Sequence, residues 1–88
     1  MRIKLKELLD AIKSSDLSLE AQIDLMYKIV IQKKVSNGLY VKEVEDGCIE
    51  CWYINIDEDG TTYHGPTNYT AEDIIDVYKM MNGIRTLK

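Results

Sequence analysis

The sequence predicts an α+β fold in which a helical hairpin and a C-terminal helix pack on one face of a three-stranded antiparallel sheet. Apolar residues recur with helical spacing in residues 3–35 and 71–82, but alternate with polar residues in 39–65. Asp46-Gly47 and Asp59-Gly60 are dipeptides typical of tight hairpin turns. The expected order is ααβββα, and a chain of 88 residues fits one domain spanning 1–88.

Three helices are expected from their apolar stripes and caps. The first covers 3–14, with the stripe Leu5, Leu8, Leu9 and Ile12. The second covers 19–35, is capped by Ser18 and ends at Asn37-Gly38. It carries an apolar stripe of Leu19, Ile23, Met26, Tyr27 and Val30, and we expect it to be the most buried element because Leu25, Ile29 and Ile31 widen this face. The last covers 71–82, begins after Thr70 and buries Ile74, Val77, Tyr78 and Met81.

Three strands are expected near 39–45, 48–57 and 61–65. A two-residue turn at Asp46-Gly47 places Val41 opposite Trp52, Tyr40 opposite Tyr53 and Glu43 opposite Glu50. The core face then carries Leu39, Val41, Trp52, Ile54, Ile56 and Tyr63. The outer face carries Tyr40, Lys42, Val44, Ile49, Cys51, Tyr53, Asn55, Thr62 and His64.

The charges are unevenly distributed along the chain. The net charge is −4, but residues 1–42 carry eight basic and five acidic residues, whereas residues 43–88 carry three and ten. No Lys or Arg lies between Glu43 and Tyr78. We therefore expect an acidic surface on the hairpins unless the basic half folds over it.

Several classes of function are not expected. No apolar stretch approaches the roughly 18–20 residues of a membrane span, and the first residues lack a signal-peptide pattern, so the expected location is cytoplasmic, without membrane contact. The net negative charge disfavours direct binding to nucleic acid. No cofactor is indicated.

The two cysteines are the first candidates for chemistry. Cys48 and Cys51 form a C-x-x-C motif, but it is predicted in a strand, where the two side chains point to opposite faces. A zinc site would need two further ligands, and no metal site is predicted. Cys51 and His64 are predicted on the same outer face, which leaves a small Cys/His enzyme as an alternative. The main expectation is that the chain is not an enzyme.

The acidic hairpins and the tyrosines are the candidate binding surface. The chain has six Tyr and one Trp but no Phe, so nearly all its aromatic side chains carry a polar group, as is common at interfaces. Carboxylates can occupy phosphate sites on a basic protein and speed the encounter by steering. The candidate partner-binding residues are Glu43, Glu45, Asp46, Glu50, Asp57, Glu58, Asp59, Tyr40 and Tyr53.

In size, acidity and lack of a catalytic motif, the chain resembles the small inhibitors that phages and mobile elements encode against nucleases, including anti-CRISPR proteins. This resemblance is one of type and rests on no shared motif. It implies an inhibitor or modulator that binds the basic surface of a nucleic-acid-binding protein. The alternative is a homodimer or larger homo-oligomer, a scaffold or regulatory subunit that pairs through its outer sheet face.

Overall fold

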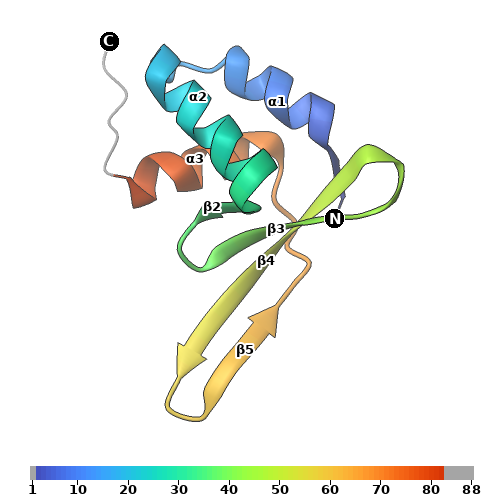
Figure 1. Ribbon diagram of the computed structural model, residues 1–88, viewed down its shortest axis with the longest axis vertical. Coiled ribbons are helices and arrows are strands. Elements are labelled where there is room, and N and C mark those ends of the chain that lie inside the picture. The colour runs from blue at the N-terminus through green and yellow to red at the C-terminus, as the bar shows by residue number, and fades with distance from the viewer. Residues whose placement is uncertain (1, 83–88) are drawn as a thin grey trace.

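The computed structural model describes residues 2–82, and the side chains of 55–57 and 61–63 lie outside its described part. Within that part the fold is α+β, with three α-helices and a five-stranded antiparallel sheet (Figure 1). The helices are α1 (Leu5–Lys13), α2 (Leu19–Tyr27) and α3 (Ala71–Met81). The strands are β1 (Ile3–Lys4), β2 (Lys34–Ser36), β3 (Leu39–Glu43), β4 (Cys48–Asp57) and β5 (Gly60–His64). The predicted class is confirmed, but the predicted order lacks the short strands β1 and β2.

The longest strand, β4, organises the sheet. One of its edges pairs with β3, and β2 lies beyond β3. Its other edge pairs with β1 at the start of the strand and with β5 at the end. The helices gather over the part of the sheet that contains β2 and β3, and the hairpin of β4 and β5 projects away from them (Figure 1). We call this projecting hairpin, residues 53–64, the arm.

The turn between β3 and β4 differs from the prediction by one residue. Three residues, Glu45–Gly47, form it, and the backbone N–H of Val44 donates to the carbonyl of Cys48 at 2.9 Å. Asp46 and Gly47 both have positive φ, of 60° and 71°. A three-residue turn of this kind is a common hairpin connection, but it has an odd length.

This odd length reverses the two faces of β4. Val41 lies opposite Cys51, and not Trp52 as predicted, because the register is shifted by one residue. Successive side chains of a strand point to opposite faces, so the shift moves each residue of β4 to the other side of the sheet. Ile49 and Cys51 are buried in the core, and the predicted core positions of Trp52 and Ile54 are wrong.

The second hairpin is confirmed, with its turn one residue earlier than predicted. Asp57 pairs with Gly60, so Glu58 and Asp59 form the two-residue turn. Gly60, at φ 127°, adopts a backbone conformation that L side chains rarely reach. Here the register differs from the prediction by an even number of residues, so β5 keeps its predicted facing relative to β4.

Helices α1 and α3 lie where they were predicted, except that α1 begins at Leu5, because Ile3 and Lys4 form strand β1 instead of the predicted helix start. On α1, Leu8 and Ile12 are fully buried. Thr70 and Asp73 begin α3 with a capping box, in which each side chain bonds the backbone N–H of the other residue. The buried side of α3 includes Tyr78, whereas Met81, predicted to be buried, is 57% exposed.

Helix α2 departs most from the prediction. Ser18 caps it as expected, its hydroxyl accepting from the N–H of Ala21 at 3.1 Å. After Tyr27 the chain makes one π-helical turn, Lys28–Gln32, and Lys33 ends the helical stretch in the left-handed conformation. The chain then continues as β2, so the predicted helix over 19–35 is wrong beyond residue 32.

The predicted core stripe of α2 faces outward. Of the three residues predicted to widen the stripe, Leu25 and, in the following turn, Ile29 are buried, at 0% and 1% exposure, whereas Ile31 is exposed. The predicted stripe residues Leu19, Ile23, Tyr27 and Val30 are exposed instead. The stretch is apolar on both sides, so its periodicity alone does not identify the buried one.

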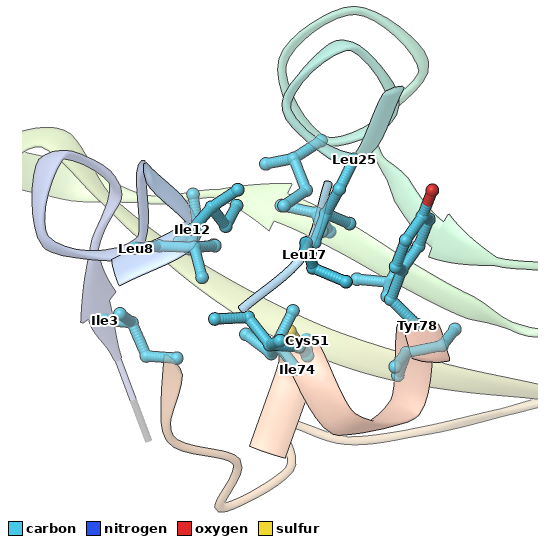
Figure 2. Close-up of a cluster of buried hydrophobic side chains, with 14 residues drawn as sticks. Ile3, Leu8, Ile12, Leu17, Leu25, Cys51, Ile74 and Tyr78 are labelled. Carbon is cyan, nitrogen blue, oxygen red and sulfur yellow. The ribbon is translucent and has the colours of Figure 1, made fainter. Parts of the chain in front are cut away.

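The core lies between the helices and the first half of β4. Figure 2 shows side chains from the helices α1, α2 and α3 and from strand β4 that converge on one cluster. From the sheet, the cluster receives Ile3, Val35, Leu39, Val41, Ile49 and Cys51. Among the described side chains, none of β4 beyond Cys51 and none of β5 belongs to it. The described side chains of the arm therefore lie outside the core, and its two strands pair through their backbones.

Candidate protein-interaction surfaces

Two of the predicted binding carboxylates form ion pairs within the chain. Glu43 forms a salt bridge with Lys33, in which Nζ of Lys33 lies 2.5 Å from Oε1 of Glu43. Glu50 pairs in register with Lys42, and its Oε2 lies 3.7 Å from Nε of Arg2. The predicted Glu43–Glu50 opposition is wrong, because the register shift separates them. The basic N-terminal half thus neutralises this part of the acidic surface.

The other predicted carboxylates lie in the two hairpin turns. Glu45 and Asp46 are exposed in the turn between β3 and β4. Glu58 and Asp59 are exposed at the tip of the arm. Asp57 closes the β4–β5 pairing through its backbone, but its side chain lies outside the described part. The acidic surface therefore consists of two separate turns at opposite ends of β4.

Tyr40 and Tyr53 do not form the predicted cross-strand pair. Tyr40 lies opposite Trp52, and Tyr53 lies opposite Leu39, so the two tyrosines occupy opposite faces of the sheet. Tyr53 is 37% exposed and meets the ring of Tyr69 edge to face, with centroids 5.8 Å apart. The predicted pairing of Tyr40 with Tyr53 across the strands is therefore wrong.

The outer face of the sheet holds an aromatic groove instead. It is a shallow cavity of about 310 Å³ lined by Tyr40, Val41, Lys42, Trp52 and Ile54. The ammonium of Lys42 lies 5.4 Å from the ring centre of Trp52, a cation–π distance. This groove lies at the base of the arm.

Trp52 is tightly held in this groove. A Cβ placed on Gly65 would come within 2.8 Å of its Cδ2, so the chain after β5 packs directly against the indole. Its buried Nε1–H has no hydrogen-bond partner in the described part of the chain. The sequence prediction assigned Trp52 and Ile54 to the core. The predicted register placed the like charges Glu43 and Glu50 opposite each other, which is unfavourable. This was the sequence feature that argued against that register and against Trp52 and Ile54 in the core.

The predicted Cys/His pairing gains no support from the environment of Cys51. Cys51 lies on the helix-covered face of β4 and is 2% exposed. Burial raises the pKa of its thiol to about 11, which disfavours the nucleophilic thiolate. His64 is exposed on β5, opposite Tyr53. Among the described residues, no three His, Cys, Asp or Glu side chains are grouped to hold a metal ion.

The two thiols should differ strongly in reactivity. With iodoacetamide at about pH 8, we expect Cys48, which is half-exposed, to be alkylated first and Cys51 to react only after unfolding in denaturant. Mass spectrometry of the digested protein measures both positions, and Cys48→Ser leaves Cys51 as a single-thiol control. Equal rates at both positions in the folded protein would contradict the burial of Cys51.

A polar contact joins α2 to α3. The hydroxyl of Tyr78 donates to Oδ2 of Asp24 at 2.7 Å, and Nζ of Lys28 donates to the same oxygen at 2.9 Å. The Tyr78 hydrogen bond, followed by that from Lys28, lowers the pKa of Asp24. Burial, with Asp24 as a second cause, raises the pKa of Tyr78. The contact fixes the side of α2 that faces the core.

The stabilisation that this contact provides should decrease in acid. Because the pKa of Asp24 is lower in the folded chain, its stabilisation is complete above the unfolded pKa and disappears as pH falls through the folded one. We expect Asp24→Asn to cost about 1 kcal/mol or less near pH 7, and this cost to shrink below about pH 4. Urea unfolding of both proteins across this range measures it, and a cost independent of pH would refute the ionic contribution.

The last surface is an apolar face formed by α2 and the π-helical turn that follows it. We call it the apolar face of α2 and define it as Leu19, Ile23, Tyr27, Val30 and Ile31. These side chains are 71%, 57%, 52%, 37% and 60% exposed, respectively. Large apolar residues clustered on one exposed helix face are unusual unless a partner covers them. Among residues 2–82, none of the helices has the length and apolar character needed to cross a membrane.

Comparison with known proteins adds no relative. No family model matches the sequence, and neither a curated protein nor a solved structure matches the chain. Any proposal about function therefore rests on the surfaces described above.

Proposed function

We propose that the chain is a protein-interaction module that presents the acidic tip of its arm to a basic protein surface. One observation carries the proposal: the arm projects from the helices and ends in the exposed acids Glu58 and Asp59 (Figure 1). A projecting hairpin can reach into a concave basic site without the helical part following it.

The aromatic groove supports the same kind of partner. Lys and Arg side chains have apolar stems that pack on aromatic rings while their charged ends reach carboxylates. The groove offers Trp52 and Tyr40 for such stems, beside the acidic arm. A basic surface that otherwise holds nucleic acid fits both features, and the module would then act as an inhibitor that competes with nucleic acid.

The contributions of the predicted acids differ under this proposal. Glu43 and Glu50 are engaged with Lys33 and Arg2, so they add little net charge for a partner. The turn acids Glu45 and Asp46 form a second exposed acidic end. We therefore assign the contact to the two turns.

The test is capture of basic nucleic-acid-binding proteins at two salt concentrations. We expect binding at about 50 mM NaCl that weakens at least about tenfold at 500 mM, since exposed charges are screened. The variant Glu45→Gln/Asp46→Asn/Glu58→Gln/Asp59→Asn should lose binding. The matched control, Glu7→Gln/Asp10→Asn/Glu72→Gln/Asp76→Asn, changes the net charge equally on the helices and should keep it.

Trp52 provides a second readout. It is the single tryptophan of the chain, so its fluorescence should change when a partner fills the groove. Binding by the turn variant as tight as that of the unchanged protein, or equal losses in both variants, would overturn the proposal.

A further inference from the structure

We infer that two copies of the chain associate through the apolar face of α2, with the two helices antiparallel. The inference goes beyond the proposed function, because it concerns the surface opposite the core side of α2 and not the arm. The stretch 19–31 is apolar on two sides, and within residues 2–82 only the side with Leu25 and Ile29 is covered. In Figure 1, α2 crosses in front of α3, and no other described element lies in front of it.

The exposed area is large enough for a dimer. At their exposed fractions, the five side chains leave about 500 Å² of mainly apolar surface, near the top of the range of the largest patch on a monomer. Two such faces remove about 1,000 Å² from water before flanking residues are counted. With those flanks, the interface reaches the roughly 1,200 Å² at which stable association begins.

The pattern of the face is self-complementary. Leu19, Ile23, Tyr27 and Ile31 are spaced four residues apart and lie symmetrically about residue 25. A two-fold axis near that residue places Leu19 against Ile31 of the second copy, and Ile23 against its Tyr27. A dimer with two-fold symmetry needs this property, since the same surface must serve both subunits.

Charge favours the antiparallel arrangement. Glu20 lies in the first turn of α2, whereas Lys34 follows the helical stretch at its C-terminal end; the neighbouring Lys33 is paired with Glu43 of the same chain. Antiparallel helices bring the acidic end of each near the basic end of the other, and their macrodipoles also attract. A parallel pair would place like charges together. We therefore choose a second copy as the occupant, because these charges complement each other.

Sedimentation velocity of the full chain tests the association. We expect the unchanged protein to form dimers at about 100 µM, and Ile23→Glu to raise the dimer dissociation constant at least about 30-fold by placing a carboxylate in the interface. Met80→Glu is the matched control, because Met80 is 78% exposed and lies on α3. It should dimerise like the unchanged protein.

Cysteine cross-linking tests the antiparallel pairing separately. In a Cys48→Ser background, Leu19→Cys combined with Ile31→Cys should form disulfide-linked dimers through residues 19 and 31. Leu19→Cys alone should not, because antiparallel helices keep the two copies of residue 19 apart. Efficient linking of the single variant would instead indicate parallel pairing and overturn the arrangement.

Two results would overturn the inference as a whole. One is a monomer at all concentrations, whether or not its α2 face binds neutral phosphatidylcholine vesicles. The other is a dimer that Ile23→Glu does not weaken. Circular dichroism confirms that each variant is folded, which is expected since Ile23 is 57% exposed. The acidic-turn variants of the proposed function should dimerise normally, so the two proposals fail independently.

Discussion

Replacing Leu25 by alanine is expected to lower the free energy of unfolding by about 2–5 kcal/mol. Leu25 is fully buried within the cluster of Figure 2, and truncation leaves a cavity that the surrounding helices fill only in part. Urea unfolding followed by circular dichroism measures the loss.

Leu19→Ala is the matched control for this prediction. Both residues are leucines of α2, but Leu19 is 71% exposed. We expect a change within about 0.5 kcal/mol, provided that the protein is dilute enough for its copies to stay apart. If Leu19→Ala cost as much as Leu25→Ala, the face of α2 that packs on the core would be wrongly assigned.

Deleting Lys42 from β3 is expected to abolish the cooperative unfolding transition or lower the free energy of unfolding by at least about 3 kcal/mol. The deletion leaves the three-residue turn unchanged but moves Val41 opposite Glu50 and Leu39 opposite Trp52, so both side chains turn to the other face of the sheet. Leu39 and Val41, at 1% and 6% exposure, would then leave the core. Thermal unfolding and a two-dimensional NMR spectrum measure the loss of the native packing.

An insertion in the turn of the arm provides the contrast. One glycine placed between Glu58 and Asp59 changes the β4–β5 turn from two residues to three, but no described core side chain lies in the arm. We expect this insertion to cost less than about 1 kcal/mol. A near-native stability for the Lys42 deletion, or a collapse caused by the arm insertion, would contradict the assignment of the buried face of the sheet.

The elements that were predicted well have one apolar side, and α3 also has a capping box. Helix α1 has a single stripe around Leu8 and Ile12, and α3 begins at the capping box of Thr70 and Asp73. Both signals lie within a few residues of the structure they define. Sequence periodicity is sufficient in such cases.

Helix α2 and strand β4 could not be oriented in this way, because both are apolar on two sides. What fixes α2 is contact with residues far along the chain, such as the hydrogen bond of Tyr78 to Asp24, 54 positions away. What fixes β4 is the three-residue turn, in which Glu45 joins the positive-φ pair Asp46 and Gly47. An Asp-Gly dipeptide is compatible with turns of either length.

For the candidate site, the sequence identified the turn acids, but not how the charges combine. The pairs Lys33–Glu43 and Arg2–Glu50 join segments that only the folded sheet brings together. The aromatic groove was missed for the same reason as the faces of β4. The charge imbalance between the two halves of the chain is therefore partly cancelled where they meet.

The separation of arm and core has a consequence for how this protein can change over evolutionary time. The described buried residues of the sheet end at Cys51, although β4 continues for six more residues. Among the described side chains beyond that point, none belongs to the cluster that the helices cover, so substitutions of these residues do not open a cavity in it. The arm can thus follow a changing partner surface while the rest of the chain keeps its sequence.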